Sequence, residues 1–410
     1  MKTPKLVLLA MAFLAPIALN VYAPLMPALK MSLSTTSDAV QLGMTLFLIF
    51  FALGQLSCGL FVELFGQKKV LLWGVSIYIV GSVIGILVND IYWLLIARIL
   101  QAIGGGFSLL LTRSIILEQN SPNKAAAKLS YIALGIASLQ ACVPSLTGYL
   151  NVYFSWQFAF YLSLIIALIA WWAIYWHLPV KSLPQPQQLE KKEERDSLRG
   201  NKVIHPTKQP SINDIIYTYI RVLVFPKFFF ISLANALTSA AFFAFVLNVP
   251  FIVADDLAGS SLDYGKWYFI VALGFWIGSF ISSQISERIG TSTMLKLGWY
   301  IATVAAFSMI VSLYVFGTNY WSLFTPMALF TFGRGLLLPN AQASAVTVTP
   351  FSRSTAMGVF SFCQLLIGAA LAQLSVSFVK QDAIFLPITI TLLVVLSLFS
   401  YAKADKCITN

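Results

Sequence analysis

Long apolar stretches separated by short polar segments constrain this chain more than any other feature. A helix needs about 20 apolar residues to cross a bilayer core, and twelve stretches of this kind follow one another. Charged residues make up only 10% of the 410 residues, whereas a soluble domain has about a quarter. The sequence therefore predicts an all-α membrane protein with twelve transmembrane helices. The expected spans cover residues 6–29, 40–62, 70–88, 92–114, 129–150, 157–177, 228–253, 265–286, 294–316, 321–343, 356–378 and 384–402.

The first stretch could alternatively be a cleaved signal peptide, because Lys2 and Lys5 precede it and Val21-Tyr22-Ala23 loosely fits a cleavage site. Its apolar run continues almost to Lys30, so we interpret it as the first span. It also contains an amide, a phenol and two prolines. Proline kinks a helix and frees a backbone acceptor, which favours a span that lines a path over one that only anchors the chain.

Basic residues are divided very unequally between the two sides of the predicted spans. Twenty Lys and Arg residues fall on the side of the N-terminus, whereas only Lys30, Lys266 and Lys380 fall on the other side. Segments rich in Lys and Arg stay in the cytoplasm, so both termini are predicted to be cytoplasmic. The net charge of +11 then reflects topology, and we expect no nucleic-acid partner.

A polar segment interrupts the series after the sixth span. Residues 184–195 read PQPQQLEKKEER, which is typical of a cytosolic linker, and a short surface helix could form near residues 212–224. We predict an N-terminal six-helix half (1–180), a linker (181–226) and a C-terminal six-helix half (227–410). The two halves contain a similar short motif: Glu63-Leu-Phe-Gly66 follows the second span, and Glu287-Arg-Ile-Gly290 lies 224 residues later.

The sequence offers little for catalysis. Four cysteines lack the spacing of metal ligands, and the two histidines, His177 and His205, lie at a span end and in the linker. An enzyme in the membrane would need a nucleophile with its base, or a metal cluster, and a channel would need a filter loop or charged rings. We therefore expect no enzyme, no cofactor and no metal.

The segment that contains Glu63 resembles a known loop signature. Residues 59–69, GLFVELFGQKK, are similar to the G-x-L-x-D-R-x-G-R-R loop of the major facilitator superfamily. Glu63, Gly66 and Lys68 match in type, while Leu64 and Gln67 occupy positions where basic residues are usual. Two related six-span halves are also the arrangement of these transporters.

Further motifs resemble the Bcr/CflA-type drug exporters, a drug:proton antiporter family within that superfamily. Asn20–Pro27 (NVYAPLMP) is similar to their D-M-Y-L-P-A-L-P, and Arg98–Gln101 to their R-x-x-Q. Arg113–Glu118 resembles R-A-x-x-R-D, and Pro144–Gly148 resembles the antiporter signature of the fifth span. Gly335–Ala341 fits G-x-x-x-P-N-A. The order and spacing of these motifs carry the resemblance.

The resemblance implies a monomeric exporter of small organic molecules in the bacterial inner membrane, which alternates between inward-open and outward-open states. Its motifs, together with polar residues inside the spans, suggest where substrate binds and where the conformation is controlled. The candidate substrate-binding residues are Asn20, Tyr22, Arg98, Gln101, Gln140, Asn235, Arg334 and Gln364. The candidate gating residues are Glu63, Gly66, Lys68, Arg113, Glu118, Pro144, Gly148 and Pro339.

Two arginines within the spans have competing interpretations. Arg98 marks either a functional site or a structural hydrogen bond to the first span, and we favour function because Gln101 lies one turn further on the same face. Arg334 could make a shared cavity positive, or it could bridge to loop groups near Glu287. For Arg113 and Glu118 we favour a structural role near the cytoplasmic end. Amides such as Gln41 could equally line a cavity or join helices.

No carboxylate is predicted at the middle of the membrane. All fifteen Asp and Glu residues fall in loops, in the linker or at span ends, and Asn20 occupies the position of the exporters' first-span aspartate. A positive cavity without a carboxylate should favour neutral or anionic substrates over lipophilic cations. Proton coupling would then use an edge acid such as Asp38 or Glu118, or the substrate's own ionisation, or be absent. Siderophore or other carboxylate export, and import or uniport by the same fold, stay open as alternatives.

Overall fold

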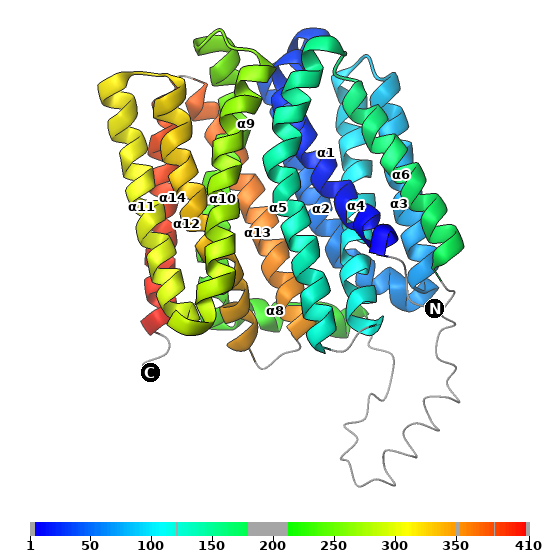
Figure 1. Ribbon diagram of the computed structural model, residues 1–410. Coiled ribbons are helices and arrows are strands. Elements are labelled where there is room, and N and C mark those ends of the chain that lie inside the picture. The colour runs from blue at the N-terminus through cyan, green and yellow to red at the C-terminus, as the bar shows by residue number, and fades with distance from the viewer. Residues whose placement is uncertain (1–4, 120–121, 179–211, 350–352, 381, 407–410) are drawn as a thin grey trace, which may run out of the picture.

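We describe residues 5–119, 122–178, 212–349, 353–380 and 382–406 in a computed structural model of the chain. Long helices run side by side in one bundle, and the shorter helix α8 lies across one end of it (Figure 1). The elements are α1 (Lys5–Ser32), α2 (Ser37–Phe65), α3 (Gln67–Leu87), α4 (Ile91–Gln119), α5 (Pro122–Tyr153), α6 (Phe158–His177), α8 (Ile212–Val224), α9 (Pro226–Phe251), the π-helical turn η1 (Ile252–Asp256), α10 (Ser261–Ile289), α11 (Thr291–Phe316), α12 (Tyr320–Thr347), α13 (Arg353–Val379) and α14 (Phe385–Lys406).

The two ends of the bundle differ, because α8 lies at only one of them (Figure 1). We call the end with α8 the α8 end and the opposite end the distal end; α1 begins and α14 ends at the α8 end (Figure 1). Helices α1–α6 form the N-terminal half and α9–α14 the C-terminal half. The surface helix that the sequence suggested near residues 212–224 is α8, and residues 179–211 of the predicted linker lie outside the described residues.

The predicted all-α membrane fold is confirmed. Ten of the described helices are long and apolar enough to cross a membrane. The predicted spans 129–150 and 321–343 are not among the ten, but they form α5 and α12, which run through the bundle beside the others (Figure 1). Arg334 and Asn340 lie inside α12 and lower its hydropathy. The observed helices often extend past the predicted spans, as α5 does, because hydropathy marks the bilayer core and not the helix ends.

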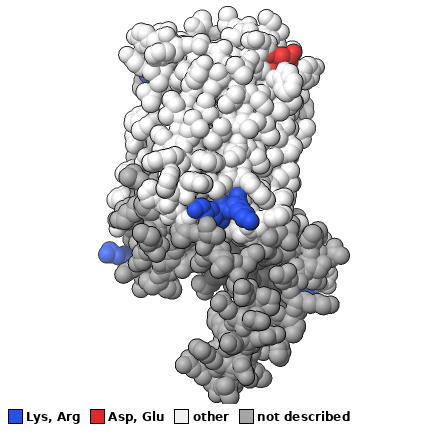
Figure 2. Space-filling model, turned by 90° about the vertical axis from the view of Figure 1, so that its right-hand side faces the viewer, with Lys and Arg blue, Asp and Glu red and all other residues white. Residues whose placement is uncertain are grey.

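The surface of the bundle matches a bilayer. Figure 2 shows a broad band without charged side chains, with basic side chains at its border toward the α8 end and an acidic one near the distal border. Exposed aromatic side chains lie near both borders: Trp172 and Trp176 at the α8 end of α6, and Tyr92 and Trp93 at the distal start of α4. Tryptophan and tyrosine prefer the level of the lipid headgroups.

The internal repeat seen in the sequence has a structural counterpart. Gly66 separates α2 from α3 with φ of 81°, and Gly290 separates α10 from α11 with φ of 88°. Each amide closes the preceding helix, by donating to Val62 O at 2.8 Å and to Ser286 O at 2.9 Å. Residues with a side chain rarely adopt this φ, so glycine is required at both turns.

Close helix packing follows the same repeat. A Cβ atom on Gly104 of α4 would overlap the carbonyl oxygen of Gly74 on α3, and one on Gly333 of α12 would lie 2.8 Å from the carbonyl oxygen of Gly298 on α11. Gly74 and Gly298 are again 224 residues apart. In a membrane, helices associate through such close contacts of small residues, because lipid supplies no hydrophobic drive between them.

Candidate functional site

Arg98 lies in α4 and is enclosed by the N-terminal half. Its Nη1 donates to the carbonyl oxygen of Ala18 on α1 at 3.0 Å and to Oε1 of Gln101 at 3.0 Å. The guanidinium also lies over two rings, 4.4 Å from that of Tyr22 and 4.1 Å from that of Phe47. Cation–π contacts of this kind stabilise a desolvated guanidinium by about 2 kcal/mol. Arg98 therefore makes the bond to the first span that the structural interpretation expects.

The space beside Arg98 is too small for a substrate. The cavity that Arg98, Tyr22 and Gln101 line has a volume of about 10 Å³, roughly the space of one water molecule. Gln101 continues the polar chain by donating from Nε2 to Ser82 Oγ at 3.0 Å. In this conformation the Arg98 cluster joins α1, α2, α3 and α4 and leaves no room for an organic molecule.

The first-span residues next to this cluster are tied to the backbone. Tyr22 donates from its hydroxyl to Val40 O on α2 at 2.8 Å. Asn20 donates from Nδ2 to Pro16 O, one turn earlier in α1, at 2.7 Å. Helix α1 continues through Pro16 and through the two later prolines without a break. Asn20 thus bonds to a carbonyl of its own helix; the acceptor that Pro16 leaves without a backbone donor lies four residues earlier, at Ala12.

Arg334 is the centre of a second cluster, in the C-terminal half. Its Nη2 donates to Ser239 Oγ on α9 at 3.1 Å, and its guanidinium lies 4.6 Å from the ring of Phe242 and 5.9 Å from that of Phe275. The Ser239 hydroxyl in turn donates to Asn235 O at 2.9 Å, so the hydrogen bonds form a chain. Among the described residues, no carboxylate forms an ion pair with Arg334 or with Arg98.

Two of the predicted amides belong to the same cluster. Asn235 on α9 donates from Nδ2 to Oε1 of Gln364 on α13 at 3.1 Å. The predicted residues Asn235, Arg334 and Gln364 therefore converge through Ser239, whereas Gln140 is half-buried on α5 and bonds to neither cluster within the described residues. Among the residues that the structure describes, Arg334 bonds to Ser239 and to no loop group; the side chain of Glu287 lies outside that set.

Two ion pairs join the halves at the distal end. Lys30 at the end of α1 lies 3.3 Å from Asp255 in η1, and Lys380 after α13 lies 3.1 Å from Asp38 at the start of α2. Asp38, one of the two predicted coupling acids with Glu118, thus occupies a partly exposed position between the halves. Its second oxygen, Oδ1, is buried without a hydrogen-bond partner in the described residues.

Amides continue this contact inward, along what we call the α2 seam, where α2 meets α9 and α13. Gln41 donates from Nε2 to Leu247 O at 2.8 Å, and Thr45 donates from its hydroxyl to Oε1 of Gln373 at 2.5 Å. Of the two interpretations for Gln41, joining helices is the one that the structure supports. Within the C-terminal half, Asn248 joins α9 to α13 by donating from Nδ2 to Ser375 Oγ at 3.1 Å.

A second contact between the halves, which we call the α5 seam, packs α5 against α10. Ser145 donates to Gly265 O at 2.7 Å, and Asn151 donates from Nδ2 to Ser261 Oγ at 3.1 Å. A Cβ atom on Gly148 would overlap the carbonyl oxygen of Ser261. The motif that contains Pro144 and Gly148 therefore lies where the backbones of two helices from different halves approach closely; a gating role for it stays a prediction.

The other predicted gating residues are spread over the α8 end and α12. Gly66 forms the α2–α3 turn, and Lys68 donates from Nζ to Tyr175 O on α6 at 2.9 Å. Arg113 is partly buried in α4, and Pro339 is exposed on α12 beside Asn340, whose Nδ2 donates to Ser282 Oγ on α10 at 2.8 Å. The side chains of Glu63 and Glu118 lie outside the described set.

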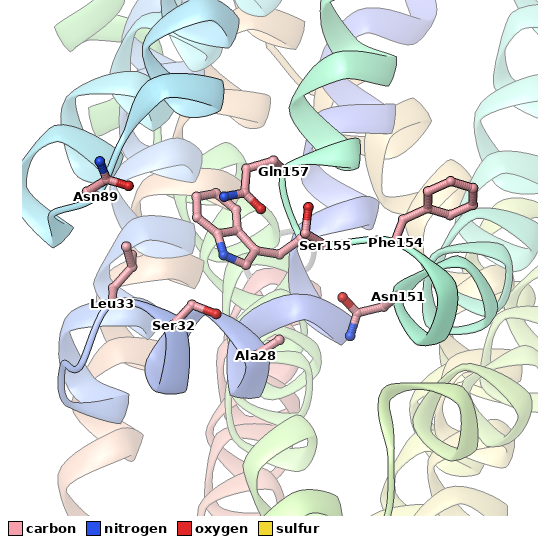
Figure 3. A pocket seen from close by; sticks show the side chains of 9 residues that line it. Ala28, Ser32, Leu33, Asn89, Asn151, Phe154, Ser155 and Gln157 are labelled. Atoms are coloured by element: carbon pink, nitrogen blue, oxygen red, sulfur yellow. The ribbon is translucent and has the colours of Figure 1, made fainter.

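A larger cavity opens at the distal surface of the N-terminal half. Figure 3 shows it between the end of α1, the α3–α4 connection and the α5–α6 connection, with a volume of about 420 Å³. Its polar lining is uncharged and consists of Ser32, Asn89, Asn151, Ser155 and Gln157. None of the predicted substrate-binding residues lines it.

Sequence reasoning missed several partners of the two arginines. Phe47 gives no signal, because the chain has 32 phenylalanines and most of them pack in apolar surroundings. Ser239 could have been found, because Thr238 and Ser239 form a polar pair inside the otherwise apolar α9. The pairing of Lys30 with Asp255 joins residues far apart in the chain and has no local signature.

Comparison with known proteins agrees with the resemblance seen in the motifs. The pattern of the Major Facilitator Superfamily matches residues 8–373. The chain is 23% identical to the bicyclomycin resistance protein homolog of Haemophilus influenzae, over 95% of this chain and 93% of that protein. It is 22% identical to multidrug resistance protein D of Escherichia coli, over 90% and 87% of the two chains.

The fold is also that of a solved transporter. The xylose transporter XylE from E. coli, in a partially occluded inward-open conformation, aligns over 98% of this chain and 97% of its own with a TM-score of 0.71 and 14% identity. The resemblance to drug exporters is confirmed by the relatives, and the expectation that the chain is no enzyme is confirmed with it. The chain is therefore a multi-pass membrane transporter that belongs to the major facilitator superfamily.

Proposed function

We propose that this protein is a secondary active transporter that exports small neutral or anionic organic molecules by alternating access. The observation that carries the proposal is the position of the described bonds between the halves. Both ion pairs and the hydrogen bonds of the two seams lie in the distal third of the bundle. Two halves held together at one end by polar bonds can rock apart there and meet at the other end.

The unequal basic charge supports an orientation for this state. With the Lys- and Arg-rich segments in the cytoplasm, the distal end faces outward, and the bonds described above close the outer side. Both termini and the segment between the halves are then cytoplasmic, in the inner membrane of a bacterium. The division into residues 1–180, 181–226 and 227–410 stays a prediction in its exact limits.

The charges inside the bundle support the substrate class. Arg98 and Arg334 are 2% and 6% exposed, and both lack a carboxylate partner within the described residues. A cationic substrate would meet this positive field without compensation, which costs free energy at low dielectric. Neutral molecules and carboxylates, including siderophores, avoid that cost. The names of the relatives, which include a chloramphenicol resistance protein of Acinetobacter baumannii, support export of drug-like molecules.

The described acids offer no carrier for protons at mid-membrane. Asp38 is paired with Lys380 at the distal end, so it reaches only one side of the membrane in this conformation. Coupling through the substrate's own ionisation, or transport without protons, fits this position better than a shuttle through Asp38. Import or uniport by the same fold is the second candidate, because a bundle closed at one end is part of the cycle in either direction.

A vesicle assay tests the proposal. The full-length protein is reconstituted in liposomes that contain chloramphenicol (neutral), naphthalene-1-acetate (anionic) or ethidium (cationic), and efflux is measured with and without a pH gradient. We expect protein-dependent movement of the neutral or the anionic probe and little movement of ethidium. Ethidium movement as fast as that of the other two would refute the charge argument.

Counterflow with the same probes separates the two directions, because it detects exchange whatever the orientation of the protein. Exchange of a probe without net efflux under any gradient would favour the second candidate. No exchange and no efflux of neutral or anionic probes would contradict the proposed transport itself. The control is the variant Gly148→Val, whose distal closure should be impaired.

A further inference from the structure

The two buried arginines both keep nitrogens without a hydrogen-bond partner among the described residues, but they differ in their number of hydrogen bonds and in their depth in the bundle. A guanidinium has five N–H donors in a planar fork. Arg98 is held by a backbone carbonyl and an amide, both bonded through Nη1, and by two aromatic faces, while its Nε and Nη2 are buried without a partner beside a cavity of only about 10 Å³. Arg334 makes one hydrogen bond, to Ser239, among the described residues, and its Nε is buried without a partner. Unused donors of a buried charge are costly unless a ligand or water satisfies them.

Arg334 also lies at the depth in the membrane where substrate binding is expected. It follows Tyr320, the first residue of α12, by 14 residues in a helix of 28, which places it about 21 Å along the helix axis. Arg98 follows Ile91 by only seven residues, or about 10 Å. Transporters of this type bind substrate near the middle of the membrane, where Arg334 lies and Arg98 does not.

The surroundings of Arg334 complement one kind of molecule. Phe242 and Phe275 present aromatic surface beside the guanidinium, while Asn235 and Gln364 add neutral amides one step further along α9 and α13. Ser239 accepts one hydrogen of Nη2, which leaves Nε, Nη1 and the other Nη2 hydrogen for a second group; the parallel donor pairs of the fork are Nε with Nη2 and Nη1 with Nη2. A carboxylate matches two parallel N–H donors of arginine, and an aromatic body next to it would contact the rings.

We infer that Arg334 binds the carboxylate of the transported molecule, with Ser239 as its positioning residue, and that the substrate class is small organic carboxylates with an aromatic or otherwise apolar body. This rests on the proposed function and narrows it from neutral or anionic molecules to anions. Arg98 then has a structural role in the N-terminal half. The substrate's negative charge replaces the missing carboxylate of the protein.

A matched pair of probes tests the inference by binding alone. Naphthalene-1-acetate and naphthalene-1-acetamide have almost the same shape and differ in charge, and their affinities for the purified full-length protein are measured by calorimetry. We expect the wild-type protein to bind the acid about 10- to 100-fold more tightly than the amide, the size of a hydrogen-bonded charge contact. Arg334→Gln should abolish that preference.

Further variants separate binding from folding. Arg334→Lys keeps the charge but not the fork, so we expect part of the preference to remain, and Ser239→Ala should reduce it several-fold. Arg288→Gln, an exposed arginine at the end of α10, is the matched control and should change nothing. Size-exclusion profiles identify variants that do not fold.

The outcomes distinguish this inference from the proposed function. Equal binding of acid and amide by the wild-type protein, binding of neither, or a preference that survives in Arg334→Gln would overturn the inference, even if vesicles export neutral drugs. A preference that Arg334→Gln abolishes would support it, even if the vesicle assay detects no transport. Export of chloramphenicol by Arg334→Gln at the wild-type rate, together with loss of acid transport, would support both.

Discussion

The α2 seam and the α5 seam occupy equivalent positions but are built from different chemistry. By the internal repeat, α2 corresponds to α10 and α13 to α5, so each seam joins one helix of each type. The α2 seam uses long polar side chains, including the Asp38–Lys380 pair and the bonds of Gln41. The α5 seam uses short side chains and a close approach of backbones at Gly148 and Gly265.

The α2 seam therefore depends on polar bonds that water can replace, and the α5 seam depends on steric fit between two backbones. Long polar side chains can replace a bond across the seam by a bond to water when the halves separate, so little net free energy is at stake. Backbones in contact leave no space for an added atom, so the α5 seam closes only if its glycines stay free of side chains. We expect mutations to affect the two seams by very different amounts.

The largest effect is expected at Gly148. In Gly148→Val the new side chain overlaps the Ser261 carbonyl, and over-packing of this kind costs about 1–3 kcal/mol. The ratio of distal-closed to distal-open protein should fall about 5- to 150-fold. Spin labels at the exposed distal positions Asn89 and Thr318, in a cysteine-free background, measure this as a longer distance between the halves.

Gly358 on α13 supplies the matched control, because nothing lies within 4 Å of a Cβ built there. Gly358→Val should leave the distance distribution unchanged. If Gly148→Val also leaves it unchanged, the α5 seam tolerates added volume and the comparison fails.

A smaller effect is expected for Gln41→Leu in the α2 seam. The substitution removes the bond to Leu247 O but nearly conserves volume, and a net hydrogen bond contributes about 0.5–1.5 kcal/mol. The closed-to-open ratio should fall about 2- to 12-fold by the same distance measurement. Gln284→Leu, an exposed position on α10, is the control; an effect as large as that of Gly148→Val would erase the distinction between the seams.

The smallest effect is expected for Asp38→Asn. Both partners of this ion pair are about half exposed, and exposed pairs contribute about 0.2–1 kcal/mol, less at high salt. The shift toward the distal-open form should be at most about fivefold at low ionic strength and absent in 1 M salt. The swapped pair Asp38→Lys with Lys380→Asp should restore the wild-type ratio. A shift that persists in 1 M salt would show that Asp38 acts through its buried Oδ1 instead.

Much of the fold could be predicted from the sequence, because it follows from hydropathy and local turns. Residues 70–88 and 384–402 were expected as spans and form α3 and α14 with nearly those limits. The repeat at Gly66 and Gly290 was visible as a pattern because a positive φ demands glycine at both turns. Helix α8 was visible because its polar and apolar residues alternate with helical period.

The site was less predictable, because it depends on which faces of distant helices meet. Arg98 and Arg334 looked equivalent as single charges in apolar spans, yet Arg98 bonds to a backbone oxygen of α1, at Ala18, and Arg334 bonds to a side-chain hydroxyl of α9, that of Ser239. Gln41 was visible as a buried amide, but its partner Leu247 lies 206 residues away. A sequence pattern gives the position of a residue along a helix; the rotation of that helix against its neighbours comes from packing.

The enclosure of Arg98 has a consequence for how the chain enters the membrane. An arginine costs about 2.5–3.5 kcal/mol at the centre of an inserting helix, and less at the position of Arg98, about 10 Å from the start of α4. The groups from other helices that hold its guanidinium are Ala18, Tyr22 and Phe47, and all belong to α1 and α2. Since synthesis proceeds from the N-terminus, these helices are already in the bilayer when α4 arrives. The guanidinium of Arg98 can contact these groups as soon as α4 enters the bilayer, so the order of synthesis itself lowers the free-energy cost of inserting α4.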